Sequence, residues 1–381
     1  MDIAIIGGGI GGLTTALALR RFGFEPQVFE QAPQLLEVGA AIAMWPNALR
    51  VLQRLGVGET VIERAGLITA VCWRSSGGKV LNCAQLPIKN VPAAALHRAD
   101  LHGVLLHALP EHTIHLGHTF QEYKNDGNKI QISFSEHHNI NCDVLIGADG
   151  LHSHVRERLP GGPPPVFRGY TVWRGIADCQ PTELQSGFAV EVQGRGQRFG
   201  IGPVGLGRLG WWASANEKTT SETPKLEDQA RLLDLFAGWW SPVVQLIEET
   251  PPAAILRTPA FDRSSTRTWG KGRMTLLGDA IHPTTPNLGQ GGCMAVEDAL
   301  VLARCLAKYA DASLALRHYE ALRQARTAAI ATYSRLYGNV GQWESHLGVL
   351  LRSVALSLVP EMVAKRLLGL IFDYDAYEVA I

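Results

Sequence analysis

The sequence predicts an α/β protein whose first domain is interrupted by a β-rich block. Three glycine-containing motifs, at residues 7–12, 147–150 and 278–292, each follow a short apolar run that is typical of a buried strand. Between the second and third motifs the pattern changes to short strands. At 381 residues the chain is also longer than most single compact cores, so two domains are expected.

The chain opens with a strand–helix–strand unit. Residues 2–6 are apolar enough for a buried strand, residues 11–22 repeat apolar side chains at helical spacing, and residues 27–30 indicate a second strand. This order of elements is the beginning of a Rossmann-like dinucleotide-binding domain.

The later elements follow from the same periodicities and from turn residues. Pro46 suits the first turn of a helix, Asn125–Gly127 suits a hairpin turn, and Gly161–Pro165 marks a clear break. We expect helices at 47–55, 100–109 and 225–249 and from Gly291 to the end, and strands at 129–134, 144–146, 170–177, 187–192, 198–202, 208–214 and 274–277.

The first motif, Gly7-x-Gly9-x-x-Gly12, lies between the first strand and the first helix. Glycines there permit a tight turn, and the unpaired N–H groups of the helix N-terminus attract a pyrophosphate. Glu30, at the end of the second strand, is positioned to accept hydrogen bonds from an adenosine ribose.

The other two motifs also follow predicted strands. Asp149-Gly150 indicates a second contact region for cofactors. Asp279 suits a sugar-alcohol chain such as ribityl, and Pro286 stiffens the loop that leads into the last glycines. Gly289, Gly291 and Gly292 open a long helix whose N–H groups would face an isoalloxazine ring. Three motifs in this order point to an enclosed FAD.

The bulk composition limits the partners. Lys and Arg total 35, as do Asp and Glu, so net charge gives no reason to expect nucleic acid as a partner. The six cysteines include no C-x-x-C pair and no zinc spacing, which predicts reduced thiols in a cytoplasmic protein and no metal site. The N-terminus has no basic leader or cleavage site, so we expect no signal peptide.

The C-terminal region is apolar but contains no run long enough to span a bilayer. Residues 347–360 include Arg352, and the apolar pattern continues to Ile371, with Lys365 and Arg366 beside it. We expect a helix packed on the body of the protein. The alternative is a face that contacts a membrane surface or an apolar substrate.

With these motifs in view, the chain resembles the single-component, FAD-dependent aromatic hydroxylases, which are flavoprotein monooxygenases built like para-hydroxybenzoate and salicylate hydroxylases. Residues 38–42 and 45–47 resemble the branch of urate hydroxylase and zeaxanthin epoxidase. Residues 285–291, and 341–345 through 358–360, resemble the alkylquinolone 3-monooxygenase branch.

The resemblance implies a Rossmann-like FAD-binding domain of the GR2 type with an inserted mixed β-sheet substrate domain and a helical C-terminal tail. The expected division is 1–70, 95–165 and 270–330 for FAD, 71–94 and 166–269 for substrate, and 331–381 for the tail. The resemblance also implies roles for individual residues. Gly7, Gly9, Gly12 and Glu30 would hold the ADP half of FAD, and Arg98 and Asp279 would hold the pyrophosphate and ribityl region. Asp149-Gly150 would serve both FAD and NAD(P)H.

Three residues are expected at the reacting end of the site: Arg198, Pro286 and Trp211. Arg198 falls where urate hydroxylase carries a substrate-positioning arginine, although Gly210 stands near the position of that branch's tyrosine, which counts against urate. Tyr170, Trp173, Trp211 and Trp212 are candidates for an apolar pocket. Strand alternation allows only one of Trp211 and Trp212 to face it.

The expected function is NAD(P)H-dependent hydroxylation of a planar aromatic or heteroaromatic molecule, with a quinolone-like compound of secondary metabolism as the first candidate. No second G-x-G-x-x-G follows, so NADPH or NADH is expected to visit transiently. Oxygen would be transferred from a flavin C4a-hydroperoxide in a pocket that excludes water. The alternatives are an epoxidase of an isoprenoid or polyene, an FAD-dependent reductase without oxygen transfer, and a catalytically silent FAD-binding redox module.

Overall fold

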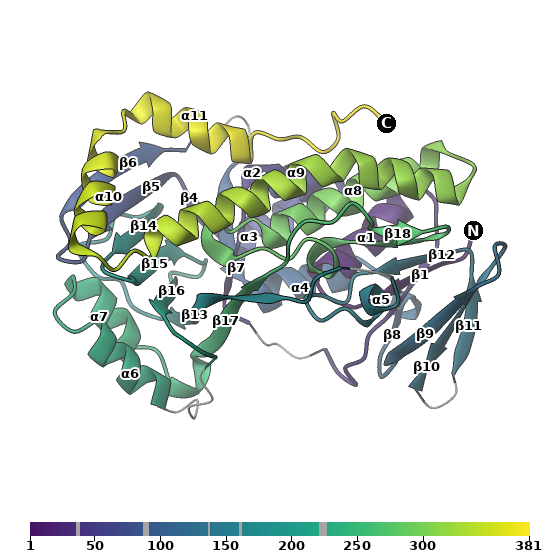
Figure 1. The fold of residues 1–381 in the computed structure, drawn as a ribbon, viewed down its shortest axis with the longest axis horizontal. Helices are drawn as coiled ribbons and strands as arrows, with labels where there is room; N and C mark the ends of the chain where they lie inside the picture. Colours follow the sequence, from purple (N-terminus) through teal and green to yellow (C-terminus); the bar gives the residue numbers. More distant parts are fainter. Residues whose placement is uncertain (36–38, 87–90, 136–137, 160–161, 221–226) are drawn as a thin grey trace.

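The computed structural model describes residues 1–35, 39–86, 91–135, 138–159, 162–220 and 227–381. Three residues used in the sequence analysis, Val38, Gly161 and Lys225, lie outside these ranges. The described residues form four β-sheets with helices packed around them (Figure 1).

A six-stranded sheet carries the N-terminal strand at its centre. β1 pairs in parallel with β12 on one side and β2 on the other, and β12 pairs in parallel with β19. Parallel strands of this kind end at one edge of the sheet, where ligands bind in open α/β folds. The strand order is β18 (Gly270–Lys271), β19 (Met274–Leu276), β12 (Val144–Gly147), β1 (Ile3–Ile6), β2 (Pro26–Phe29) and β8 (Ile114–His115).

A seven-stranded mixed sheet draws on two separate stretches of the chain. The β14–β5 pair is parallel and the other pairs are antiparallel. Its order is β17 (Leu256–Asp262), β13 (Val166–Ala177), β16 (Leu209–Asn216), β15 (Gln197–Pro203), β14 (Phe188–Gln193), β5 (Ala70–Ser75) and β6 (Val80–Gln85). We retain the division into FAD, substrate and tail regions as a proposal consistent with this interruption.

Two small antiparallel sheets and the helices complete the fold. The sheets are β3 (Ala41–Met44), β7 (Ala93–His97) and β4 (Gly66–Ile68), and β11 (Asn139–Cys142), β10 (Ile130–Phe134) and β9 (Phe120–Asn125). The helices are α1 (Ile10–Arg21), α2 (Pro46–Arg54), α3 (Gly58–Arg64), α4 (Arg98–His107), α5 (His154–Glu157), α6 (Asp228–Leu235), α7 (Ser241–Glu248), α8 (Gly291–Lys308), α9 (Ala312–Gly341), α10 (His346–Leu358) and α11 (Glu361–Phe372).

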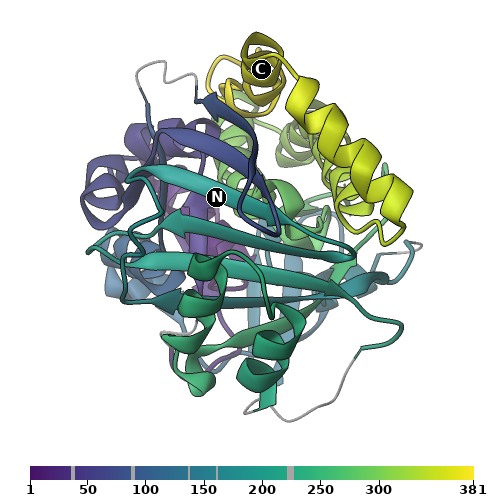
Figure 2. The same ribbon diagram turned by 90° about the vertical axis from the view of Figure 1, so that its left-hand side faces the viewer.

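The two large sheets have separate hydrophobic cores. The first core joins the six-stranded sheet to α1, α2, α4 and α8. The second lies between one face of the seven-stranded sheet and helices α6 and α7. The long helix α9 extends from the six-stranded sheet to the seven-stranded sheet (Figure 1). Helices α6 and α7 cover one face of the seven-stranded sheet, and α10 lies on the side of the other face (Figures 1 and 2). That face is therefore the one available to a substrate.

Most expected helices and strands are confirmed, with shifts of a few residues at their ends. The helix expected at 225–249 is instead divided into α6 and α7, and the helix expected from Gly291 onward is divided into α8, α9, α10 and α11. The prediction of helix to the C-terminus is wrong for the last nine residues, 373–381, which form turns and irregular structure. These residues follow α11 and meet α2 and α8: Arg54 pairs with Asp375 at 2.8 Å, and Arg304 donates to the carbonyl of Ala376 at 3.0 Å. Backbone carbonyls in this segment accept hydrogen bonds from an arginine of α8 and not from the N–H groups of a further helical turn.

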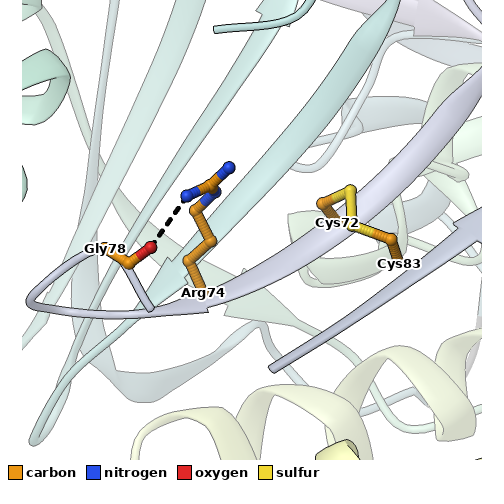
Figure 3. Close-up of a disulfide and its surroundings, with 4 residues drawn as sticks. All are labelled: Cys72, Arg74, Gly78 and Cys83. Atoms are coloured by element: carbon orange, nitrogen blue, oxygen red, sulfur yellow. Dashed lines mark hydrogen bonds between the residues drawn. A yellow bond between two sulfur atoms is a disulfide. The ribbon is translucent and has the colours of Figure 1, made fainter. Parts of the chain in front are cut away.

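The expectation that all six cysteines are reduced is contradicted. Cys72 on β5 and Cys83 on β6 are directly opposite each other in the antiparallel pair and form a disulfide (Figure 3). Arg74 donates to the carbonyl of Gly78 at 2.8 Å across the same hairpin. The spacing of eleven residues carries no motif, so only the strand register brings the two sulfur atoms together. The other four cysteines are free.

Alkylation without prior reduction tests the disulfide. Burial raises the pKa of Cys142, Cys293 and Cys305 to about 12, so these thiols are expected to react slowly. We expect peptide mass spectrometry to find Cys72 and Cys83 linked and unlabelled, and Cys83 labelled only after reduction. Labelling of both cysteines in freshly lysed cells would instead favour the reduced thiols expected from the sequence.

Candidate active site

The turn after β1 is shaped by glycines at three positions. Gly7 has φ of 109°, and a Cβ there would lie 2.5 Å from the carbonyl oxygen of Ala148. A Cβ on Gly12 would lie 1.9 Å from the carbonyl oxygen of Gly7. By contrast, a Cβ on Gly9 would meet nothing within 4 Å. Gly7 and Gly12 are therefore required for packing, while Gly9 leaves the N-terminus of α1 open to a ligand.

Glu30 follows β2 and lies beside this turn. Its Oε2 accepts a hydrogen bond from the backbone N–H of Gly8 at 2.7 Å, and its Oε1 accepts from Ala32 at 2.9 Å. The two bonds fix the carboxylate at the edge of the sheet. Each oxygen keeps an acceptor position, as recognition of ribose hydroxyls requires.

Asp279 and Arg98 come from distant parts of the chain and lie close enough to interact electrostatically. Asp279 lies in the short 3₁₀-turn η5 (Gly278–Ala280), and Arg98 is the first residue of α4. Burial raises the pKa of Asp279, and the positive charges of His282 and Arg98 partly offset this. Among the described residues the Asp279 carboxylate has no hydrogen-bond donor, so it is free to bind a hydroxyl-bearing ligand.

A buried ionic cluster holds the Asp279 turn in place. Asp298 on α8 accepts from the backbone N–H of Gly278 at 3.2 Å, pairs with His282 at 2.5 Å, and accepts from Arg323 at 2.6 Å. Arg323 also pairs with Glu297 at 2.6 Å. His282 therefore has a structural role, because its Nε2 is committed to a buried carboxylate.

The Asp149-Gly150 motif lies between β12 and α5. Asp149 Oδ2 accepts from the backbone N–H of Val155 at 3.1 Å, whereas its Oδ1 is buried without a partner in the described structure. Burial raises the pKa of this carboxyl group. Arg156 is also buried, and its Nη2 is unpartnered among the described residues. Buried polar atoms of this kind are suited to contact a polar ligand.

The last glycine motif forms the loop before α8. Pro286 begins the 3₁₀-turn η6 (Pro286–Leu288), and Gly289 follows with φ of 61°. A Cβ on Gly289 would lie 2.9 Å from Nε1 of Trp45, and one on Gly292 would lie 3.1 Å from Ile42. The loop can pass this close to β3 and α2 only with glycine. The first N–H groups of α8, from Gly291 onward, have no acceptor within the helix.

These elements border a cavity of about 720 Å³. Asp279, Pro286, Gly289, Gly291 and Gly292 contribute to its lining. The open face of the seven-stranded sheet and apolar side chains of α10 and α11 form the rest of the wall. A cavity of this size with mostly apolar walls suits an enclosed small molecule.

Arg198 lies in this cavity wall but is not a free cation. Only 1% of the residue is exposed. Its guanidinium donates to Gln342 at 2.9 Å and to the side-chain oxygen of Asn287, and pairs with Glu191 at 3.5 Å. The arginine therefore connects the substrate sheet to the Pro286 loop and to the end of α9.

The structure corrects the choice between two tryptophans. The indole of Trp211 stacks on Phe199 at a centroid distance of 5.3 Å and donates to Thr250 at 2.8 Å, on the α6–α7 side of the sheet. Trp212 alternates to the other face, 5.2 Å from the guanidinium carbon of Arg198. Both tryptophans contribute to the cavity lining, but the Trp211 indole packs in the core on the α6–α7 side and the Trp212 indole lies on the face that carries Arg198. Trp173 is also core, because it donates to buried Asp228 at 2.9 Å.

The sequence analysis did not identify several residues that line the cavity or contact Arg198. Asn287 donates to Tyr170 at 3.0 Å, and Glu191 accepts from Tyr337 at 2.9 Å, which extends the polar contacts of Arg198. Arg174 also lines the cavity, with a bond of 3.3 Å to Thr258. No local motif marks these positions. Only the pairing of Arg198 with Ser214 and of Arg174 with Trp212 would have identified the shared face.

The comparisons with known proteins agree with this geometry. The profile of a family described as FAD binding domain matches residues 1–334. The chain is a member of this FAD-binding family. It is 40% identical over 358 residues to the aurachin C monooxygenase/isomerase of Stigmatella aurantiaca, covering 91% of each chain. It is 34% identical to the zeaxanthin epoxidase of Spinacia oleracea and spans 55% of that protein's length.

Solved structures give the same result for the fold. HpxO of Klebsiella pneumoniae, in complex with FAD and uric acid, matches 98% of this chain with a TM-score of 0.92 and 28% identity. A salicylate hydroxylase in complex with substrate matches 99% of the chain with a TM-score of 0.82 and 22% identity, which supports the fold alone. The flavoprotein is an FAD-dependent monooxygenase with the expected Rossmann-like fold and inserted sheet.

The residues of this chain fit FAD on structural grounds as well. The open N-terminus of α1 and the N–H groups at the start of α8 are donors suited to phosphate and to the N1 edge of a flavin ring. The carboxylates of Glu30 and Asp279 are acceptors suited to the hydroxyl groups of a ribose and a ribityl chain.

Replacing Gly12 with alanine tests the cofactor turn. The added Cβ would meet the carbonyl of Gly7, so the turn must open and we expect FAD affinity to fall at least about tenfold. Gly103→Ala on α4 is the control, because a Cβ there meets nothing within 4 Å. Fluorescence titration of the apoprotein with FAD measures both. Equal affinities for the two variants would contradict the assigned turn.

Replacing Arg323 with leucine tests the buried ionic cluster. Two buried carboxylates, Glu297 and Asp298, would lose their main cation, and removal of one partner from such a cluster typically costs about 3–5 kcal/mol. We expect a fall of this size in the free energy of unfolding of the FAD-loaded protein in urea. Gln324→Leu, one residue further along α9, is the control, because it loses a single neutral hydrogen bond, to the carbonyl of Arg267. A loss below about 1 kcal/mol would show that the cluster is not structural.

Proposed function

We propose that this flavoprotein hydroxylates a planar heteroaromatic small molecule, and that the substrate is a quinolone carrying an apolar tail. The single observation that carries the proposal is the mostly apolar cavity, which is lined by the Pro286–Gly292 loop, by the open face of the sheet and by the C-terminal helices. A flat ring fits beside the loop, and an apolar tail fits between the helices. Similarity to an aurachin C monooxygenase supports the same chemistry.

The cofactor contacts follow the three motifs. We assign the pyrophosphate to Gly7, Gly9 and Gly12, and the ribose to Glu30. We assign the ribityl and pyrophosphate region to Arg98 and Asp279, and the flavin ring to Gly289, Gly291 and Gly292; Asp149-Gly150 contacts both FAD and NAD(P)H. FAD held by these residues would supply hydride acceptance from NADPH or NADH and the oxygen-transfer chemistry.

The protein contributes positioning and the exclusion of water. Pro286 stiffens the loop against the substrate, and Trp212 offers an aromatic face to it. Arg198 holds Asn287 and presents positive charge to the cavity, where it would stabilise the enolate of an enolisable heterocycle. The apolar walls keep water away from the reacting atoms.

A second candidate is epoxidation of an isoprenoid or polyene. Its support is the 34% identity to a zeaxanthin epoxidase and the apolar end of the cavity. A reductase without oxygen transfer and a silent FAD-binding module have no such specific support. For the remaining partners we propose a cytoplasmic monomer or homodimer that contacts a membrane surface through its C-terminal helices.

Turnover with a substrate panel tests the proposal. Purified holoprotein would be given NADPH or NADH with 2-alkyl-4-quinolones, salicylate, urate or a carotenoid, with reductant oxidation followed in the spectrometer and products identified by mass spectrometry. We expect a quinolone to accelerate oxidation and gain one oxygen atom. Oxygenation of the carotenoid alone would favour the epoxidase. Acceleration without any oxygenated product would favour the reductase.

Arg198→Lys tests the role of the arginine. A lysine ammonium cannot bond Gln342, Asn287 and Glu191 together, so the loop and the anion site are both weakened. We expect kcat/KM for the accepted substrate to fall roughly a hundredfold, typical of losing one electrostatic stabiliser. FAD affinity is expected to stay within about twofold. Arg195→Lys, on the exposed turn before β15, is the control. Unchanged kcat/KM in both variants would remove Arg198 from the site.

A further inference from the structure

The C-terminal helices α10 and α11 carry an unusually apolar outer surface. They meet at an angle of 98°, and within the described residues no single helix is long and apolar enough to cross a membrane, although this bent pair meets that test together. Figures 1 and 2 show the pair, in yellow, on the outside of the molecule. Its outer face comprises nine side chains that are 45–80% exposed: Leu347, Leu350, Leu351, Val354, Leu358, Met362, Val363, Leu367 and Leu370.

The inner face of the same helices closes the substrate cavity. Leu356, Val359, Ala364 and Leu368 line it. Leu367 belongs to both faces, because it lines the cavity and is also 54% exposed. Leu367 is therefore a residue at which the cavity lining meets the exposed surface of the helix pair.

Hydrogen bonds attach the helix pair to the rest of the protein, and these bonds lie on its inner side. Asn82 on β6 donates to the carbonyls of Leu356 and Val359, at 2.7 and 2.8 Å, and so fixes the elbow between the helices. Buried Arg352 donates to the carbonyl of Gly194 at 2.6 Å, and Arg326 donates to that of Ile371 at 2.7 Å. The polar contacts of the pair therefore point into the protein, which is the reverse of an ordinary surface helix.

The cations beside this face lie on α11. They are Lys365 and the exposed Arg366. The one acidic side chain of the two helices, Glu361, is paired with Lys365 at 2.8 Å. An apolar helix face bordered by cations is the composition of a helix that lies in the interface of an anionic bilayer.

We propose that the outer face of α10 and α11 rests on an anionic phospholipid surface, and that the apolar substrate passes from the lipid into the cavity beside Leu367. The passage of substrate rests on the proposed function, whereas the contact with lipid does not. Lipid is favoured over a second copy of the chain because a protein interface would cover the cavity wall at Leu367. Lipid instead dissolves the apolar tail that the cavity accepts.

Vesicle co-sedimentation of the full-length holoprotein tests the contact. The vesicles would contain phosphatidylcholine and phosphatidylglycerol in equal parts, with pure phosphatidylcholine for comparison. Met362→Ser/Leu370→Ser removes two outer side chains that do not line the cavity. We expect binding to the anionic vesicles, weaker binding to the neutral ones, and a roughly tenfold or greater loss in the variant, since each buried apolar side chain adds to membrane affinity.

The control variant is Leu116→Ser/Leu314→Ser, which alters exposed leucines after β8 and on the first turn of α9. It should bind vesicles as the parent protein does. An equal loss in both variants, or no binding of the parent protein, would overturn the contact. Light scattering supplies a further check: a dimer that Met362→Ser/Leu370→Ser converts to a monomer would assign this face to a second copy.

Turnover separates this inference from the proposed function. A short-tailed, water-soluble quinolone should be oxidised equally by the parent and by Met362→Ser/Leu370→Ser, whereas a long-tailed quinolone held in vesicles should be oxidised more slowly by the variant. If no quinolone is oxidised but anionic vesicles still bind, the proposed substrate fails and the lipid contact stands. If long-tailed substrate in vesicles is oxidised equally by both proteins, the route from the lipid is wrong.

Discussion

The flavin-facing parts of this protein depend on the buried carboxylate of Asp298. Burial alone would raise the pKa of Asp298, but His282 and Arg323 lower it below its usual range, so the carboxylate stays ionised. In that state it binds the Gly278 N–H on one side and Arg323 of α9 on the other. Asp298 thereby fixes three elements to one another: the turn that carries Asp279, the start of α8 and the long helix α9. The part of the site that they form is expected to be rigid.

The substrate side is organised by a second arginine. Arg198 contacts Asn287 on the Pro286–Gly292 loop and Gln342 at the end of α9, so the seven-stranded sheet, this loop and α9 meet at one guanidinium. The cavity beside them is lined in part by α10 and α11, whose outer side chains are also apolar. In our proposals, the same two helices therefore serve both the substrate and the contact with lipid.

The cofactor domain could be predicted because its chemistry is local. Gly7, Gly12 and Glu30 lie within one strand–helix–strand unit, and each has a role that spacing alone indicates. The substrate pocket could not be predicted in the same way, because it depends on register. Trp211 and Trp212 differ by one position, and only the pairing of β16 with β15 shows which indole faces Arg198. The Cys72–Cys83 bond was missed for the same reason.

Oxygen labelling tests the central claim, which is that this flavoprotein transfers oxygen to an aromatic ring bound in the cavity. The holoprotein would consume NAD(P)H under ¹⁸O₂ with an accepted quinolone, and labelled product and hydrogen peroxide would be measured against NAD(P)H consumed. The account predicts one ¹⁸O atom in the product for nearly every NAD(P)H, with little peroxide. Peroxide in amounts equal to the NAD(P)H consumed, with no labelled product from any compound of the panel, would contradict it.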